Sequence, residues 1–497
     1  MSTLVKTAAQ THPAPAKEMR PRPRIMLSVM LLSVFMAVAN IFVVNVATPA
    51  IQSGLHSSFS GVQFVITGYT LAYAIALIIG GRLGDRYGRK RMLMIGVAGF
   101  TLASLLCGVA SGVNMLILAR IIQGLSAALI SPQVLSLIQV NYPAEKRASV
   151  FGLYGASQGI AASSGQLIGG LLLYWNPWDL DWRMVFFFSV PLGLIILSMI
   201  PFIQESKEPV KTRLDLSGAV LIAAGLLMLV YPLVQGQKEG WPALLIISLI
   251  MSVPVLAVFA WFEKRLLKHG RVPFMNVQLF RHKMFTVGML IVFILLCSQA
   301  AFFLVTAYLL QVGLGFSALK AGSVILPMGL GYFAASLMSS RISARIGPHV
   351  LTIGSALTVL GFLTLALSVH ATGIGFNGYK WIPALAVLGI GQGFVAAPIT
   401  NIVLSKIRPG DIGSASGILT TGMQVAFAIG IGLIGIVWLN ALGSPAANVS
   451  PQAFAQSYAD AYLLCLYLLA GLTAILLPLV LVLANRRKSQ ADGSAAD

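Results

Sequence analysis

The segment Gly81-Arg82-Leu83-Gly84-Asp85-Arg86-Tyr87-Gly88-Arg89-Lys90-Arg91 decides the fold class of this chain. It holds five Arg or Lys residues and one Asp, in a protein of which only 9% of the residues are charged. The apolar runs on its two sides, 61–80 and 92–110, are each about long enough to cross a bilayer as a helix. Loops rich in Arg and Lys stay on the cytoplasmic side of a membrane. The segment therefore predicts a cytoplasmic loop between two membrane-spanning helices.

The whole composition is typical of a polytopic all-α membrane protein. Of the 497 residues 57% are hydrophobic, and the mean hydropathy is +0.88, more than a soluble chain of this length could hide from water. A net charge of +19 could indicate nucleic-acid binding, but the basic residues cluster between nearly uncharged spans. We therefore expect the lipid bilayer, and no nucleic acid, as a partner. The three cysteines lie in apolar runs, so we expect no disulfide framework, metal or cofactor: Cys107, Cys297 and Cys465.

Hydropathy predicts fourteen spans with both termini in the cytoplasm. On this map 28 Arg and Lys residues lie on the cytoplasmic side, and four lie outside: Arg183, Lys238, Lys320 and Lys380. The predicted spans cover residues 26–50, 61–80, 92–110, 113–139, 149–174, 183–203, 216–235, 242–262, 284–311, 319–339, 350–369, 382–404, 414–440 and 461–484.

The spans form two related halves with an inserted pair between them. Gln123-Gly124 followed by small residues and a proline is similar to Gln392-Gly393 and the residues after it, and Arg86-Tyr87-Gly88 is similar to Arg345-Ile346-Gly347. Chance recurrence of Gly, Ala and Gln in apolar helices is the alternative. The predicted parts are a cytoplasmic N-terminal tail (1–25), a six-helix bundle (26–204), a linker with two extra spans (205–283), a second six-helix bundle (284–484) and a cytoplasmic tail (485–497). Repeated bundles with a site between them are typical of transporters.

Arg120 is the one basic residue inside a predicted span. A charge there costs at least a few kcal/mol unless it faces a polar cavity or a partner. Helical spacing puts Arg120, Gln123, Ala127 and Ser131 on roughly one face, which favours a polar cavity. An arginine that snorkels to the lipid head groups is the alternative.

Amide side chains in several other spans favour the same cavity, although each alone could bond a neighbouring helix. The predicted cavity residues are Asn40, Asn45, Arg120, Gln123, Gln158, Gln166, Gln392 and Gln424. Small residues predict close helix packing in the fourth and fifth spans, at Gly124, Gly155, Gly159, Gly165, Gly169 and Gly170.

The acidic residues are all expected outside the middle of the membrane. Asp85 and Glu263 are placed in cytoplasmic loops, and Asp215 where a loop enters the seventh span. Proton relays in membranes usually use Asp, Glu or His inside the bundle. The chain also has no Gly-Lys-Ser/Thr motif for ATP phosphates and no aqueous domain for an enzyme site, so we expect neither ATP-driven transport nor an enzyme.

With these motifs the chain resembles the major facilitator superfamily, in particular its fourteen-span drug:proton antiporter branch. Gly81-x-Leu83-x-Asp85-Arg86-x-Gly88-Arg89-Lys90 is similar to the signature between spans 2 and 3, and Arg120-x-x-Gln123-Gly124 to that of span 4. The resemblance implies that Asp85 contacts the other half in the outward-facing state, that Gly81, Arg86, Gly88, Arg89 and Lys90 accompany this conformational switch, and that Arg120 and Asp85 are the candidates for proton coupling.

Three segments depart from the branch, at four positions. Asn40 and Phe42 stand where the first span of the branch has Asp and Thr, and Gln166 replaces a proline of the antiporter signature. In the second half Ala344 precedes Arg345 where an acid is expected.

The leading hypothesis is a secondary exporter of small amphipathic or toxic compounds that works by alternating access with protons as the coupling ion. Arg120 without a carboxylate favours neutral or anionic cargo. The alternatives are an exporter of an endogenous metabolite or lipid with atypical coupling, and a scaffold or sensor that retains the fold. We expect a monomer in a bacterial inner membrane; the sequence neither predicts nor excludes a periplasmic adaptor.

Overall fold

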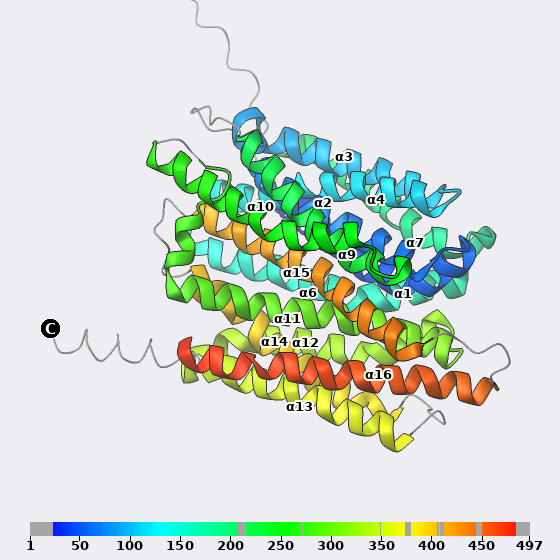
Figure 1. Ribbon diagram of the computed structural model, residues 1–497. Helices are drawn as coiled ribbons and strands as arrows, with labels where there is room; N and C mark the ends of the chain where they lie inside the picture. Colours follow the sequence, from blue (N-terminus) through cyan, green and yellow to red (C-terminus); the bar gives the residue numbers. More distant parts are fainter. Residues whose placement is uncertain are drawn as a thin grey trace, which may run out of the picture.

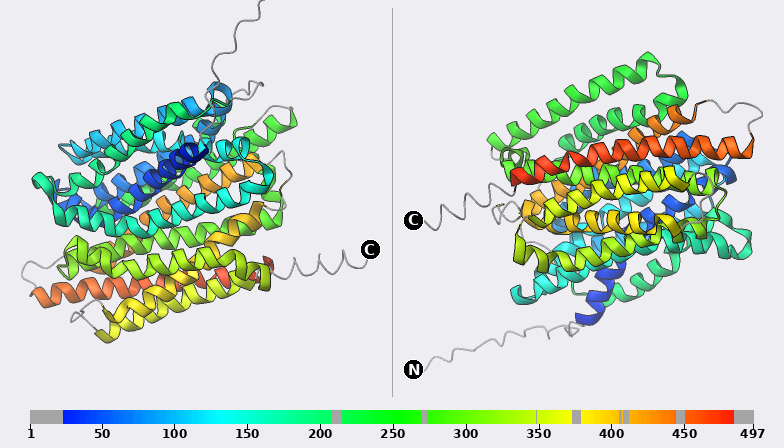
Figure 2. Two further views of the ribbon diagram at one scale, coloured as in Figure 1. Left: turned by 180° about the vertical axis from the view of Figure 1, so that it is seen from behind. Right: turned by 90° about the horizontal axis from the view of Figure 1, so that it is seen from below.

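The computed structural model describes residues 23–483 apart from 207–214, 270–272, 348, 373–378, 405–406, 408–411 and 444–449. The described residues form helices and connecting turns, with no strand among them. Figures 1 and 2 show long helices that run side by side along one common direction. The elements before the inserted pair are α1 (Pro23–Gly54), α2 (Phe59–Tyr87), α3 (Arg89–Gly108), α4 (Val113–Ala128), α5 (Ser131–Asn141), α6 (Ala144–Trp175), η1 (Pro177–Asp179), η2 (Asp181–Arg183), α7 (Met184–Phe187), α8 (Ser189–Met199) and η3 (Ile200–Phe202).

The inserted pair and the second half follow in the same order that the sequence predicts. They comprise α9 (Leu216–Glu239), α10 (Ala243–Lys268), η4 (Val277–Arg281), α11 (Lys283–Tyr308), η5 (Leu309–Gly313), α12 (Ala318–Ile346), α13 (His349–Thr372), η6 (Tyr379–Trp381), α14 (Ile382–Leu404), α15 (Ile412–Leu442) and α16 (Pro451–Ala474).

Thirteen helical segments of the described chain are long and apolar enough to cross a membrane. The predicted fifth span is absent from these thirteen, although α6 has 32 residues at its place. Gln158, Gln166 and the many Gly and Ser residues of α6 lower its hydropathy. The protein is therefore an all-α polytopic membrane protein with two six-helix halves and two inserted central helices.

The charged segment that opens the sequence argument is not a loop, which corrects the prediction. Its first part is the last two turns of α2, and α3 begins at Arg89, so only Gly88 lies outside a helix. Gly88 has φ of 108°, a backbone conformation that other residues adopt at a cost. The chain therefore turns within one residue, and the charged side chains sit on two rigid helix ends.

The predicted fourth span is divided into α4 and α5. The helix is interrupted at Leu129 and Ile130, and Pro132 lies in the first turn of α5. Proline has no backbone N–H and so breaks the hydrogen-bond ladder of a continuing helix. Ser131 consequently belongs to another helix than Arg120, and it bonds Tyr73 at 2.5 Å. Arg120 also contacts α2, through the Val65 carbonyl and the Tyr69 ring, so both residues lie on the side that packs on α2 in spite of the break.

The two halves repeat one close helix contact. In the first half Gly124 of α4 lies so close to α2 that a Cβ atom on it would meet the carbonyl oxygen of Tyr69. In the second half Gly393 of α14 meets the carbonyl oxygen of Tyr332 on α12 in the same way, at 2.5 Å. This equivalence favours a true repeat over chance recurrence. In this repeat Gly389 occupies the position that corresponds to Arg120, three residues before Gln392. A Cβ atom on Gly389 would meet the carbonyl oxygen of Met328.

Helices α9 and α10 lie outside the two halves, over the line where α2 meets α15 (Figure 1). The Tyr231 ring of α9 packs against Phe64 of α2, with ring centroids 5.4 Å apart. Leu233 of α9 lies 3.0 Å from the place of a Cβ on Gly432 of α15. The inserted pair thus contacts both halves.

Candidate functional site

The halves are joined at the end of the bundle opposite to the charged segment. Between α1 and α11, the Tyr308 hydroxyl donates to Gln52 Oε1 at 2.7 Å. Between α2 and α15, Gln63 Nε2 donates to the carbonyl of Ile431 at 2.8 Å. Between α6 and α12, the place of a Cβ on Gly170 lies 2.6 Å from the Ala318 carbonyl oxygen. These three contacts close this end of the bundle.

The contact between α6 and α12 loosens toward the end that bears the charged segment. A Cβ atom on Gly322 would lie 2.7 Å from the Gln166 carbonyl oxygen, and a Cβ atom on Gly159 would lie 3.4 Å from Phe333. A Cβ atom on Gly155, one turn further along α6, would have no heavy atom within 4 Å. The prediction that Gly155 packs a helix is therefore wrong for this conformation, since α6 has already parted from α12 there.

The remaining predicted packing glycines do contact other helices. Gly165 and Gly169 pack on α1. A Cβ atom on Gly165 would lie 2.7 Å from Phe42 Cβ, and a Cβ atom on Gly169 would lie 2.8 Å from the Val43 carbonyl oxygen. Together with Gly170 on α12 and Gly124 on α2, they let helices approach to backbone contact.

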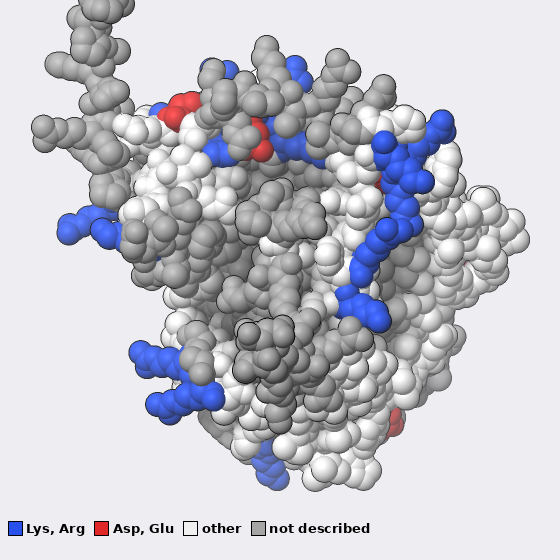
Figure 3. Space-filling model, turned by 90° about the vertical axis from the view of Figure 1, so that its left-hand side faces the viewer, with Lys and Arg blue, Asp and Glu red and all other residues white. Residues whose placement is uncertain are grey.

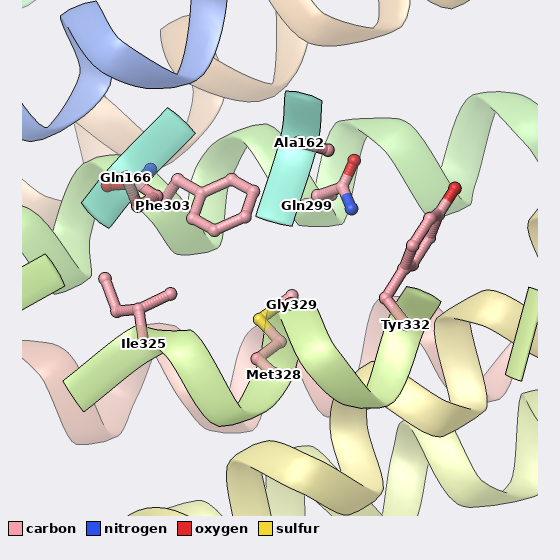
Figure 4. Close-up of a pocket in the computed structure, with 8 residues that line it drawn as sticks. All are labelled: Ala162, Gln166, Gln299, Phe303, Ile325, Met328, Gly329 and Tyr332. Carbon is pink, nitrogen blue, oxygen red and sulfur yellow. The ribbon is translucent and has the colours of Figure 1, made fainter. Parts of the chain in front are cut away.

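A pocket lies between the halves, just inside this closure (Figure 4). It is small in this conformation: its cavity volume is about 20 Å³, within about 320 Å³ of unfilled space that includes the open side. In Figure 4 Gln166 of α6 and Gln299 of α11 lie on one side of it, opposite to Met328 and Gly329 of α12, and Tyr332 of α12 stands at its edge. The other lining residues are Ala162, Phe303 and Ile325. The lining combines amides, aromatic rings and a thioether, and none of its described residues is a carboxylate or a cation.

The amides of this pocket have unused hydrogen-bonding capacity. Gln166 is 3% exposed, and neither of its side-chain amide atoms has a described partner. Gln299 Nε2 donates to Gln392 Oε1 at 3.1 Å, and Gln392 Nε2 has no described partner. Buried amide groups without partners are costly, so a ligand with hydrogen-bonding groups would gain these bonds on entry.

Phe42, a departure from the expected first-span pattern, packs across the line between the halves. Its ring meets Phe303 edge-on with centroids 5.3 Å apart, and it meets Phe427 of α15 at 6.4 Å. Edge-to-face pairs of this kind are favourable beyond their buried area. Phe42 thus makes an aromatic contact at the position where the branch has the hydroxyl group of a threonine.

Arg120 lies in a closed polar network of the first half rather than on the pocket wall. The side chain is fully buried, which excludes the snorkelling alternative. Its Nη1 donates to Asn40 Oδ1 at 2.5 Å and to Gln123 Oε1 at 2.6 Å, and its Nε donates to the Val65 carbonyl at 3.0 Å. The guanidinium also stacks over the Tyr69 ring, 4.2 Å from its centroid. The charge is therefore solvated by amides, a carbonyl and an aromatic face.

The network extends to two more helices. Gln123 Nε2 donates to Ser104 Oγ of α3 at 2.7 Å, and Asn40 Nδ2 donates to Ser189 Oγ of α8 at 3.4 Å. Arg120 Nη2 has no described hydrogen-bond partner. The structure thus joins three of the predicted polar residues, Asn40, Arg120 and Gln123.

The other predicted cavity residues lie apart from this network. Gln166 lines the pocket and Gln392 bonds one of its walls. Gln158 bonds the Tyr154 hydroxyl within α6 at 3.1 Å. Asn45 Nδ2 and Gln424 Oε1 are buried without a described partner.

The charged segment is held by local contacts. Asp85 accepts two hydrogen bonds from Arg89, at 2.8 and 3.2 Å. The Glu205 carboxylate accepts from the backbone N–H groups of Lys90 and Arg91, at 3.0 and 3.1 Å. A carboxylate at this place caps the first turn of α3 and complements its dipole.

The surroundings of the turn itself are equally tight. Glu205 Cδ lies 2.5 Å from where a Cβ would stand on Gly88, a second reason for glycine there. Lys90 Nζ donates to the Pro201 carbonyl, Arg86 lies 5.2 Å from the Tyr87 ring centroid, and Gly81 faces Pro132 at 3.6 Å.

Basic residues gather on the end of the molecule where the halves are parted. Figure 3 shows this end, with Lys and Arg around its rim and few acids. The exposed basic residues at its helix ends include Arg91, Lys264 and Lys283. This distribution agrees with the charge asymmetry of the sequence.

Glu263 is misplaced by the sequence prediction, which puts it in a loop. It lies inside α10, which continues to Lys268, and it is fully buried. The predicted span ends at residue 262 because three basic residues follow within the next six positions. Those basic residues are half-exposed or exposed, whereas Glu263 faces the protein.

Several pocket residues were not predicted from the sequence, above all Gln299, Phe303 and Tyr332. Gln299 had a signal, since it is an amide in the middle of an apolar run. Aromatic residues such as Phe303 have none, because the same residue types face lipid elsewhere in these helices.

Comparisons with known proteins agree with this architecture. The sequence matches the family model of the Major Facilitator Superfamily over residues 30–431. It is 34% identical to the probable actinorhodin transporter of Streptomyces coelicolor, over 81% of this chain and 70% of that protein. It is 31% identical to the puromycin resistance protein of Streptomyces alboniger, over 95% and 93%. Among solved structures, a POT family transporter in complex with 5-aminolevulinic acid superposes with a TM-score of 0.64 at 14% identity, over 92% and 96%, which shows a common fold.

Proposed function

This chain belongs to the major facilitator superfamily, and we propose that it exports neutral or anionic amphipathic compounds from the cytoplasm by alternating access. It is a secondary transporter and not an enzyme. The relatives are named for the export of antibiotics or for resistance to them. Those names support small-molecule efflux as the activity of this chain.

One observation carries the cargo proposal, the chemistry of the pocket between the halves. Its walls offer Gln166 and Gln299 as hydrogen-bonding groups and Phe303 and Tyr332 as flat apolar surfaces. None of the described lining residues is a carboxylate, so among them a lipophilic cation would lose its hydration without gaining a counter-charge. Flat molecules with carbonyl and hydroxyl groups match this wall better.

The direction of transport rests on charge. We infer that the basic end shown in Figure 3 faces the cytoplasm, with both termini on that side, in a bacterial inner membrane. In that orientation the contacts at Gln52, Gln63 and Gly170 close the outer side. The conformation is then inward-facing, and cargo enters the pocket from the cytoplasm or the inner leaflet. Both halves of the site belong to one chain, which supports a monomer as the working unit.

Protons are the proposed coupling ion. Asn40 cannot take up a proton where the branch has a carboxylate, so Arg120 and Asp85 remain the candidates from the family pattern. Asp85 pairs with Arg89 in this conformation, and we propose that it exchanges this partner for the second half when the inner side closes.

The experiment that tests the function is export in proteoliposomes with an imposed pH gradient. The probes are a neutral quinone dye, an anionic dye and a cationic dye. We expect transport of the first two, with Gln166→Leu and Gln299→Leu reducing it about tenfold and Gln456→Leu, an exposed residue of α16, leaving it unchanged. Transport confined to the cationic dye would contradict the proposed cargo class.

A further inference from the structure

The cytoplasmic end of the inserted pair holds a charged cluster that the family pattern does not assign. It consists of Arg82 on α2 and Asp215 at the N-cap of α9, which are partly buried, and Glu263 on α10, which is fully buried. The chain segment Pro273–Met275, which leads through η4 to α11 of the second half, lies among them.

Each member of the cluster holds part of this segment. Arg82 Nη2 donates to the carbonyls of Pro273 and Phe274. Asp215 Oδ2 accepts from the Phe274 N–H at 3.2 Å, and Glu263 Oε2 accepts from the Met275 N–H at 2.7 Å. The other Asp215 oxygen accepts from the Gly218 N–H at 3.0 Å and caps α9. The cluster therefore connects α2, both inserted helices and the entry into the second half.

The two carboxylates converge on the same small space. Both Glu263 Oε1 and Asp215 Oδ2 lie next to Gly218, so that a Cβ atom on this glycine would meet both of them, Asp215 Oδ2 at 2.6 Å. Glu263 is fully buried, and its Oε1 has no described hydrogen-bond partner. Asp215 is only partly buried, so the crowding falls on Glu263, because a carboxylate that is buried beside another carboxylate resists ionisation.

The charge count of the cluster is uneven. Among the described residues, the titratable or charged groups that face Glu263 are Asp215 from the α9 end and Arg82 from α2. Within these three groups one guanidinium offsets one carboxylate, and the second carboxylate is left over beside the buried Glu263 side chain. A single proton on the carboxylate pair makes the three groups neutral together.

We propose that Glu263 and Asp215 form a proton-binding site whose occupancy depends on the position of Arg82. Arg82 is three residues from Asp85 on the rigid end of α2, so a movement of the charged segment moves it relative to the carboxylates. An approach of Arg82 favours release of the proton, and its withdrawal favours uptake. The site thus places a titratable carboxylate on the inserted pair, in a chain whose first span has Asn40 instead. Proton binding at this site does not depend on which cargo the central pocket takes.

The test measures the proton directly, by infrared spectroscopy of the carboxylic C=O stretch in the purified full-length protein in liposomes at neutral pH. We expect a band of a protonated carboxyl in the wild type. Glu263→Gln and Asp215→Asn should each remove it, because the remaining carboxylate then faces Arg82 alone. Asp460→Asn, an exposed acid on α16, is the matched control and should leave the band unchanged. Arg82→Gln should keep the band to higher pH than in the wild type.

Circular dichroism and size-exclusion chromatography establish that each variant is folded, and Asp215→Asn provides a second route if Glu263→Gln is unstable. A wild type without the band, or a band that survives in both Glu263→Gln and Asp215→Asn, overturns the proposal. A wild type that shows the band but exports none of the three dyes contradicts the proposed function only, so the two failures are distinguishable.

Discussion

Arg120 on α4 and Asn40 on α1 are joined by a hydrogen bond of 2.5 Å from guanidinium Nη1 to amide Oδ1, with no carboxylate lining that contact. A buried cation is usually compensated by an anion. Here it is distributed over an amide oxygen of α1, one of α4 and a carbonyl of α2. This arrangement holds three helices of the first half around one charge, and it can be tested by substitution at either end.

Asn40→Asp should stabilise the protein, because it supplies the missing counter-charge to Arg120. A hydrogen bond between charged groups contributes more than one to a neutral amide, so we expect the free energy of unfolding to rise by about 2 kcal/mol. Thermal unfolding in detergent measures it. Asn45→Asp is the control on the same helix: its side chain is also buried but has no arginine partner, and it should lower the melting temperature. Equal effects at the two positions would contradict the assignment.

Arg120→Lys should reduce export more than tenfold although the charge is kept. An ammonium group has no planar fork that could reach the Asn40, Gln123 and Val65 oxygens together, and it loses the stacking on Tyr69. Arg265→Lys, on the exposed face of α10, should leave export unchanged. The measurement is dye efflux from proteoliposomes with equal amounts of protein. Wild-type efflux by Arg120→Lys would show that charge alone suffices.

Gly124→Ala should destabilise the fold, whereas Gly155→Ala should be neutral to within about 0.5 kcal/mol. A Cβ on Gly124 would meet the Tyr69 carbonyl oxygen of α2, a backbone atom that cannot move independently. Gly155 faces open space. Melting temperatures of the two variants check the difference. A loss of transport in Gly155→Ala without a loss of stability would indicate that α6 packs there in another conformation.

A cross-link between Gln52 and Tyr308 should trap the conformation described here. The two side chains are bonded across α1 and α11 at the closed end, so the Gln52→Cys, Tyr308→Cys double variant should react with a short bifunctional maleimide. We expect export to stop and to return when a cleavable linker is cut. The native cysteines are all buried, which limits the background. Full export by the cross-linked protein would show that this end does not need to open.

The sequence predicted the helix order, the two halves and the inserted pair because hydropathy and charge act on whole spans. It failed where one residue changes the local geometry. Gly88 turns a predicted loop into a one-residue junction, and Pro132 divides the fourth span. Glu263 was placed in a loop, since hydropathy averages over its basic neighbours and does not show which side chain faces the protein.

The candidate site was predicted only in part. Asn40, Arg120 and Gln123 could be grouped because polar residues in apolar spans need partners. That Gln166 and Gln299 line one pocket depends on how the halves meet, a relationship between helices over a hundred residues apart. No local pattern in the sequence encodes it.

The repeat that pairs Arg120 with Gly389 has an evolutionary consequence. Six of the eight pocket residues come from α11 and α12, whereas the Arg120 network belongs wholly to the first half. If the pocket takes the cargo as proposed, substitutions that change what is recognised can accumulate in one half while the other retains its buried charge. Related exporters can thus acquire new cargo without rebuilding the part of the molecule that holds that charge.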